Sequence, residues 1–245
     1  MADLTVIVPI FNEEEGIGRL EGGFDDYFSK TGLSVEVVLV DDGSTDNSLL
    51  EIKQLCEKDS RFSYISLKKN TGLSAALKAG FDACKSPWVG YIDADLQTAP
   101  EDFLVLEPFI RDFDLVMGNR TERKDNLTKR ITSRVANGFR NWMLKDGVND
   151  SGCPLKIMKT EMAQSLPTFK GMHRFFPALV QMMGGTVHQV PVRHFPRQTG
   201  YSKFSFKNRL LGPIIDTFAV RWLKSKVIRF RIQEASLKQL DHSNL

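Results

Sequence analysis

The residues with the clearest chemical meaning are two aspartates, Asp93 and Asp95, separated by a single alanine. They directly follow an apolar run over residues 88–92 and precede Gln97. At the end of a strand, carboxylates at positions i and i+2 can both be aimed at one point. Such a pair can hold a hard divalent cation with few protein ligands and leave the other coordination positions to water and a diphosphate. Acidic capping of the next helix is the structural alternative.

Strand and helix signals alternate along the chain and predict the elements that position this pair. Apolar runs of about six residues predict strands over 5–10, 35–40, 62–67, 88–92 and 114–118. Helical patterns lie between them over 48–57 and 73–84, and Asn12 with Glu15 resembles a capping box that opens a helix toward Phe28. Buried strands separated by helices are typical of a parallel sheet covered on both faces. We therefore expect an α/β nucleotide-binding fold.

Polar residues recur where the predicted strands end. Pro9, Phe11 and Glu13 follow the first strand, Asp41 and Asp42 the second, and Asn119 and Arg120 the fifth. In parallel sheets ligands bind beyond the carboxyl ends of the strands, so we expect these groups to line one pocket. Turn formation by the Asp-Asp-Gly-Ser run at 41–44 and a solvated Arg120 are the bland alternatives.

Familiar phosphate-binding loops are missing. Residues 16–18 carry only two glycines of a dinucleotide fingerprint, and the chain has no Walker sequence. A diphosphate would then be neutralised by a metal ion and basic side chains, which gives Asp93 and Asp95 more weight.

Composition limits the class of protein. The chain has 245 residues, 42% of them hydrophobic and 26% charged, as expected for a single globular enzyme domain with or without an elaborated end. A net charge of +3 is too small to indicate a nucleic-acid partner. Three cysteines without CxxC spacing indicate a reducing compartment and no disulfide framework. With no signal-peptide pattern and no long apolar run, we expect a cytoplasmic protein.

Four motifs together resemble a known enzyme family. They lie at residues 8–13, 40–46, 70–76 and 93–97, in the order and spacing of family 2 glycosyltransferases with the GT-A fold. The Asp-Ala-Asp-Leu-Gln form, the Gly-Asn-Arg run at 118–120 and the segment 197–203 are similar to the polyprenyl-phosphate glycosyltransferases, the group that contains dolichol-phosphate mannose synthase.

The resemblance implies a site for a nucleotide-sugar donor, UDP- or GDP-linked. The positions that would contact the nucleotide are Pro9, Phe11, Glu13, Asp41, Asp93 and Ala94. Phe11 stands where the family often has tyrosine, so ring stacking is kept and a hydroxyl is lost. Asp95 would ligate Mg²⁺ or Mn²⁺, with Gln97 close to the metal and the sugar. Arg197 and Lys203 would belong to a late loop that closes over the diphosphate.

The hypotheses about function differ in the molecule that accepts the sugar. A family 2 enzyme inverts the anomeric carbon, and a lipid phosphate acceptor is already an anion that needs no base. Arg120 and Arg134 match positions that bind such a phosphate, and we expect Asp95, Arg120, Arg197 and Lys203 to serve catalysis. A saccharide hydroxyl acceptor would instead need a base, such as Glu122, Asp125 or Asp150. A non-catalytic nucleotide-sugar-binding subunit is the hypothesis of another class.

The chain divides into a catalytic domain over 1–205, an amphipathic helical extension over 206–233 and a polar tail over 234–245. Trp222 and several apolar residues of the extension alternate with lysine and arginine. Such a helix can lie in a membrane interface or pack on the domain or a second subunit. Candidate partners are therefore a polyprenyl phosphate, a membrane surface on the cytoplasmic side and an oligomeric copy.

Overall fold

A seven-stranded sheet forms the centre of the molecule in the computed structural model, which describes residues 1–120, 127–193, 195 and 206–228, and among these the side chains of all except 127–134 and 206–211. The strand order is β3-β2-β1-β4-β6-β5-β7. The strands are β1 (Leu4–Ile10), β2 (Val35–Asp41), β3 (Phe62–Ser66), β4 (Trp88–Tyr91), β5 (Leu115–Arg120), β6 (Lys156–Lys159) and β7 (Val187–Val192).

All strands run parallel except β6, which lies antiparallel between β4 and β5. The register aligns Ile7 of β1 with Tyr91 of β4, and Lys156 of β6 with both Tyr91 and Met117 of β5. The carboxyl ends of β1, β2, β4 and β5 therefore meet at one edge. The predicted α/β class with a mostly parallel sheet is confirmed, and β6 is an addition to it.

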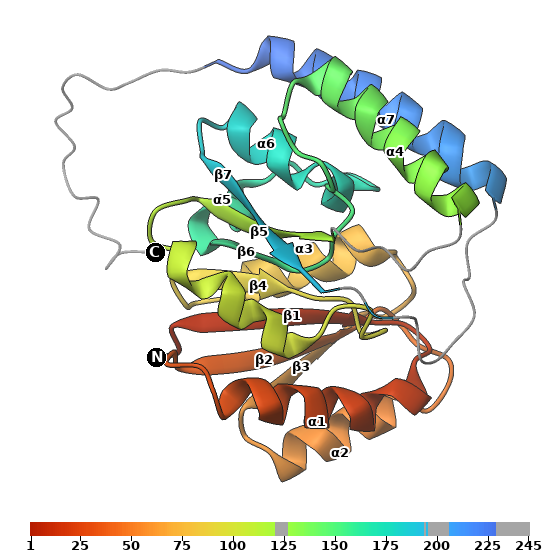
Figure 1. The fold of residues 1–245 in the computed structure, drawn as a ribbon. Helices are drawn as coiled ribbons and strands as arrows, with labels where there is room; N and C mark the ends of the chain where they lie inside the picture. Colours follow the sequence, from red (N-terminus) through yellow and green to blue (C-terminus); the bar gives the residue numbers. More distant parts are fainter. Residues whose placement is uncertain (121–126, 194, 196–205, 229–245) are drawn as a thin grey trace, which may run out of the picture.

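Helices cover both faces of the sheet (Figure 1). The α-helices are α1 (Ile17–Phe28), α2 (Ser48–Lys58), α3 (Leu73–Ala83), α4 (Leu127–Leu144), α5 (Thr160–Ser165), α6 (Phe176–Met182) and α7 (Phe206–Lys226). Short 3-10 helices are η1 (Glu14–Gly16), η2 (Pro100–Val105), η3 (Glu107–Phe109) and η4 (Met172–Arg174).

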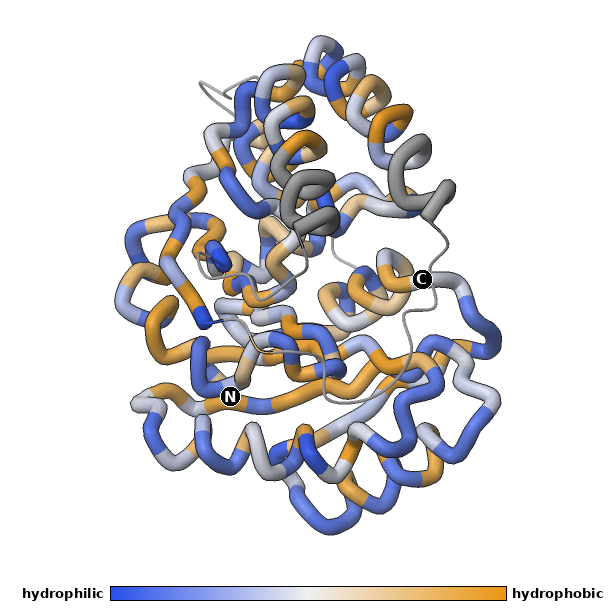
Figure 2. The backbone as a smooth tube through the Cα atoms, turned by 45° about the vertical axis from the view of Figure 1, so that its right-hand side comes forward, coloured by the Kyte–Doolittle hydropathy of each residue, from blue (hydrophilic) through white to orange (hydrophobic). Residues whose placement is uncertain are grey.

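The core consists of two apolar layers, one on each side of the sheet. Ile7 points into the layer shared with α3, α5 and α6, whereas Val6 and Val8 point into the layer shared with α1 and α2. This is the alternation that a strand buried on both faces imposes. Figure 2 shows the apolar residues concentrated in the central strands.

Helices α4 and α7 form an arm beyond α6, away from the sheet (Figure 1). Arg221 and Lys224 of α7 donate hydrogen bonds of 2.5 and 2.6 Å to the carbonyls of Met143 and Leu144, which end α4. Basic side chains commonly satisfy the last carbonyls of a helix in this way. None of the helices in the described part of the chain combines the length and apolar character needed to cross a bilayer.

The predicted capping box at Asn12 is wrong. Asn12 adopts a left-handed φ of 52°, and its side-chain oxygen accepts a hydrogen bond of 2.8 Å from the backbone N–H of Thr45. The helix begins later, with η1 leading into α1. The Asn12 side chain therefore links the end of β1 to the loop after β2, because it bonds to the distant Thr45 and not to the start of a helix.

Candidate active site

The sheet edge brings together the predicted site residues that the structure describes. Their side chains or backbones lie at or just beyond the carboxyl ends of four strands. These residues are Pro9, Phe11, Glu13, Asp41, Asp93, Ala94, Asp95, Gln97 and Arg120. Arg120 is the last residue of β5 instead of following it.

Asp41 and Asp42 are buried and organise the loop after β2. The Asp41 carboxylate accepts hydrogen bonds from the Ser44 N–H at 3.0 Å and the Ser66 hydroxyl at 2.9 Å. Asp42 accepts the backbone N–H groups of Thr71 and Gly72, both at 2.8 Å. The Asp41 carboxylate keeps lone pairs beyond these two bonds, since each oxygen can accept twice. It is held in one orientation while able to accept from a ligand.

Gly43 is required between these loops. It has a φ of +67°, and a Cβ built on it would lie 2.4 Å from the backbone carbon of Lys69. Only glycine fits such a close backbone approach at positive φ. The glycine lets the loops after β2 and β3 meet behind the site.

The residues after β1 form the neighbouring wall. Pro9, Phe11 and Glu13 are each half-buried, and the Glu13 N–H donates to the Ser48 hydroxyl at 2.8 Å. This bond anchors the turn after β1 to the start of α2. Phe11 after β1 offers a partly accessible aromatic ring, and Asp41 at the end of the adjacent strand β2 offers an ordered acceptor.

The two aspartates after β4 have different environments. The Tyr91 hydroxyl donates to Asp93 Oδ1 at 2.6 Å, and loss of hydration together with the charge of Asp95 raises the pKa of Asp93 to about 6. Asp95 is half-buried, and its Oδ1 accepts the backbone N–H of Gln97 at 3.1 Å. This Asx-type turn, with Leu96 at a φ of 52°, fixes the orientation of the Asp95 carboxylate against the backbone of Gln97.

The oxygen donors of Asp95 and Gln97 are of the type that Mg²⁺ and Mn²⁺ take. Within the described ranges, no group of three or more His, Cys, Asp or Glu side chains is placed to hold a metal by itself. The donor set therefore fits a cation that shares its coordination sphere with a ligand.

Arg120 forms a buried ion pair with Asp150. Its Nε and Nη2 lie 2.7 and 3.0 Å from the two carboxylate oxygens, and both side chains are more than nine-tenths buried. Hydrogen bonding to Asp150 keeps the pKa of Arg120 above its usual value although burial acts to lower it. The pair as a whole is neutral, but its guanidinium acts to lower the pKa of Asp93.

Lys156 is a site residue that the sequence analysis missed. It is 1% exposed, donates a hydrogen bond to the Cys153 carbonyl, and its Nζ lies 5.6 Å from the centre of the Tyr91 ring. Burial lowers its pKa to about 8. Lys156 begins a strand whose other end is also a lysine, so the local sequence gives no signal that this lysine is buried, and buried lysines are rare.

Several predicted residues lie outside the described part of the structure. These are Glu122, Asp125, Arg197 and Lys203, together with the side chain of Arg134, whose backbone belongs to α4. Their assigned roles stay predictions.

Most of the chain matches a known protein family. The model of glycosyl transferase family 2 matches residues 5–166, which include β1 to β6 and the whole sheet edge described above. The chain belongs to glycosyl transferase family 2.

The sequence of this family 2 glycosyltransferase is similar to those of two transferases named for polyprenyl-phosphate acceptors. A dodecaprenyl-phosphate galacturonate synthase of Rhizobium johnstonii is 32% identical over 224 residues, covering 89% of this chain and 66% of the relative. An undecaprenyl-phosphate 4-deoxy-4-formamido-L-arabinose transferase of Edwardsiella ictaluri is 29% identical, covering 82% and 62%. The chain thus spans slightly less than two thirds of the length of these relatives.

Solved structures confirm the fold. Glucosyl-3-phosphoglycerate synthase of Mycobacterium tuberculosis, in complex with phosphoglyceric acid, has a TM-score of 0.66 at 17% identity, covering 93% of this chain and 81% of that one. A mannosyltransferase of Pyrobaculum calidifontis, in complex with GDP-Man and Mn²⁺, has a TM-score of 0.61 at 20% identity, covering 89% and 63%. The family 2 chain therefore has the predicted GT-A fold.

Proposed function

We propose that this protein is an inverting glycosyltransferase that moves a sugar from a UDP- or GDP-sugar to a polyprenyl phosphate. The names of its relatives, which specify dodecaprenyl and undecaprenyl phosphate, support this acceptor class. The reaction is an in-line displacement: a phosphate oxygen of the acceptor bonds to the anomeric carbon, and the nucleoside diphosphate leaves.

The donor occupies the wall formed by the ends of β1, β2 and β4. Phe11 stacks on the base, Pro9 and Glu13 border it, and Asp41 accepts from base or ribose. Asp93 and Ala94 line the nucleotide from the other side. The ordering bonds on Asp41 support this role because a carboxylate fixed before binding loses little entropy on binding.

Asp95 and Gln97 would hold the metal, and Arg197 and Lys203 would supply positive charge to the diphosphate. When bound, Mg²⁺ or Mn²⁺ would neutralise the negative charge of the leaving nucleoside diphosphate. The protein orients its own oxygen donors for this purpose through the Asx-type turn between Asp95 and Gln97.

One observation favours a phosphate acceptor over a hydroxyl acceptor: Asp150 is paired with Arg120 at 2.7 Å. A hydroxyl nucleophile would need a carboxylate base. Of the three candidate bases, Asp150 is the one in the described part of the chain, and its protonation would break a buried ion pair and leave Arg120 unpaired, which is costly. A phosphate needs no base. It needs positive charge, which Arg120 and, as we propose, Arg134 supply at the acceptor end of the pocket.

The arm of α4 and α7 supports peripheral docking on the cytoplasmic face of a membrane. Trp142 and Trp222 are 72% and 63% exposed, and Ile215 and Phe218 are also exposed on α7. Exposed tryptophans beside basic side chains are typical of interfacial helices. We assign the arm's extension, residues 206–233, to this role, next to a catalytic domain over 1–205 and a polar tail over 234–245.

The test begins with the donor. A thermal-shift panel of UDP- and GDP-sugars with Mn²⁺ identifies the ligand that raises the melting temperature. The radiolabelled form of that donor is then offered with undecaprenyl phosphate or with saccharide acceptors. A butanol-extractable product that mild acid cleaves is the expected result.

Two other outcomes would refute the proposal. Label found in saccharide and not in lipid would assign a hydroxyl acceptor, in spite of the paired Asp150. Donor binding without turnover on any acceptor, with membranes and Mn²⁺ present, would indicate a non-catalytic nucleotide-sugar-binding subunit.

A further inference from the structure

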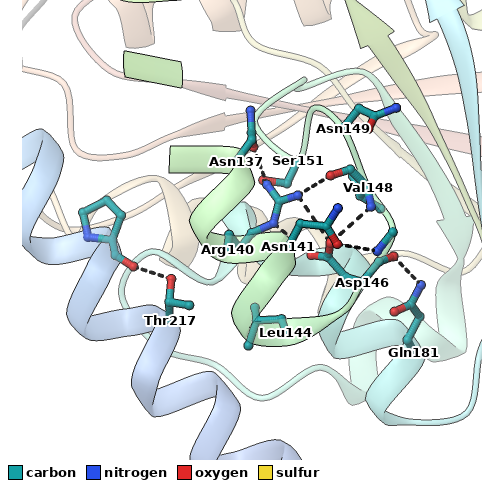
Figure 3. A network of polar contacts seen from close by, with 12 residues as sticks. Asn137, Arg140, Asn141, Leu144, Asp146, Val148, Asn149, Ser151, Gln181 and Thr217 are labelled. Atoms are coloured by element: carbon teal, nitrogen blue, oxygen red, sulfur yellow. Dashed lines mark hydrogen bonds and ion pairs between the residues drawn. The ribbon is translucent and has the colours of Figure 1, made fainter. Parts of the chain in front are cut away.

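Arg140, near the end of α4, is the centre of a buried polar network (Figure 3). Arg140 is 5% exposed. Its Nε and Nη2 atoms donate hydrogen bonds of 2.9 and 3.4 Å to the carboxylate of Asp146. Nη2 also donates to the Val148 carbonyl at 2.5 Å, and Nη1 donates to Asn137 and Ser151. Five acceptors thus match the five N–H donors of a guanidinium.

Three of these partners belong to the segment 145–151, which leads from α4 to the acceptor end of the site. The segment has no regular structure and contains two left-handed residues, Lys145 with a φ of 52° and Gly147 with a φ of 68°. Backbone outside a helix or sheet ladder takes its hydrogen bonds from side chains, other backbone groups or water. In this segment Arg140 donates to the Val148 carbonyl and also holds the side chains of Asp146 and Ser151.

The same segment carries Asp150, the partner of Arg120. Asp150 lies between Val148 and Ser151, which Arg140 holds on either side. Its carboxylate in turn orients the Arg120 guanidinium through bonds of 2.7 and 3.0 Å. The contacts of Arg140 and those of Asp150, joined through the backbone of segment 145–151, therefore connect α4 to the end of β5.

We propose that Arg140 is a positioning residue for the acceptor phosphate site. This role rests on the proposed function, in which Arg120 binds the acceptor phosphate. Arg140 touches no substrate. It holds segment 145–151 in place, so that Asp150 keeps the Arg120 guanidinium in the orientation needed to bind the phosphate. It also fixes the start of this segment to α4, the helix that carries Arg134.

The test compares three variants with the wild type. Arg140→Gln removes the charge and most donors, Arg140→Lys keeps the charge without the planar set of donors, and Ser151→Ala removes one contact. Arg61→Gln is the matched control, since Arg61 also pairs with aspartates but lies on the surface next to Phe28, outside the site. Affinity for undecaprenyl phosphate in detergent micelles and affinity for the UDP- or GDP-donor with Mn²⁺ are measured separately.

Arg140→Gln is expected to weaken acceptor binding on the order of 10- to 100-fold, the loss typical of a displaced binding group, and to leave donor affinity unchanged. Arg140→Lys and Ser151→Ala should show smaller losses in the same direction. Amide hydrogen exchange should rise in residues 145–151 and stay unchanged in β1 and β2. If Arg140→Gln does not fold, the two milder variants carry the test.

Unchanged acceptor affinity in the variants, with exchange raised in 145–151, would overturn the positioning role while leaving the proposed function intact. Equal losses for donor and acceptor would also overturn it, because they indicate general destabilisation. If the wild type itself binds no undecaprenyl phosphate, the proposed function fails first and the role of Arg140 fails with it.

Discussion

Replacing Lys156 by methionine is expected to stabilise the fold at neutral pH. The lysine is buried beside the Tyr91 and Phe176 rings, and its pKa falls from 10.5 to about 8. Because one pKa unit is worth about 1.4 kcal/mol, the buried ammonium costs about 3 kcal/mol at pH 7. Methionine has similar length, carries no charge and packs well against aromatic rings.

The variant also loses something. The hydrogen bond from Lys156 to the Cys153 carbonyl disappears, at a cost of about 1 kcal/mol. The net gain should therefore be about 2 kcal/mol in the free energy of unfolding at pH 7. Transfer activity should fall at the same time, because the Lys156 charge acts to keep the nearby Asp93 carboxylate ionised. A variant that is more stable but less active would indicate that the Lys156 charge serves the site at the expense of stability.

The pH dependence provides a stricter test. The folded state has the lower pKa, so between about pH 8 and pH 10.5 the unfolded chain binds more protons and wild-type stability rises with pH. The advantage of the variant should shrink across this window, by at most about 1.4 kcal/mol per pH unit. Urea unfolding of both proteins at each pH gives the difference, in which other titrating groups cancel.

Lys159→Met is the matched control in the same strand. Lys159 is partly exposed, and its bond to Asp114 at 2.8 Å raises its pKa. Its removal should cost roughly 0–1 kcal/mol, as for other surface ion pairs. The reasoning would be refuted if Lys156→Met were less stable than the wild type at pH 7, or if the difference between them did not change with pH.

Three further outcomes follow from the site and the arm. Asp95→Asn should lower transfer about 1000-fold by removing the negative charge of the proposed metal ligand, with an unchanged circular dichroism spectrum. Activity that stays full and metal-stimulated would exclude the assignment. Arg120→Gln should raise the KM for polyprenyl phosphate about 10- to 100-fold more than the KM for the donor, and a proportionate rise in both would contradict an acceptor role. The double variant Phe218→Ser, Trp222→Ser should reduce binding to anionic vesicles about tenfold or more in a flotation assay. A wild type that forms dimers and ignores vesicles would instead assign this face to a second subunit.

Much of the fold could be predicted from local sequence. β1, β2 and β4 are mainly apolar, with Thr5 in β1 and Glu36 in β2 as interruptions, and such segments have few alternatives to a buried parallel sheet. The position of the site followed, since the polar residues at 41–42 and 93–95 come directly after those runs. β6 was not predictable in the same way. It is four residues long and begins and ends with lysine, a pattern that favours an exposed turn over a strand in the middle of a sheet.

The contacts at the acceptor end of the site cannot be predicted from local sequence, because they form between residues that are far apart in the chain. Asp150 is 30 residues from Arg120, and each alone looks like an ordinary surface charge. Arg140 belongs to a helix, and an arginine in a helix usually reaches solvent. Whether such a residue is buried depends on how α4 and segment 145–151 pack, and this is decided by tertiary structure. In the proposed function, donor recognition thus depends on short motifs at strand ends that can be identified in the sequence, whereas acceptor recognition depends on charged pairs that form only in the folded chain. Variants at Arg140 and Asp150 are for this reason the more informative test of which acceptor the protein uses.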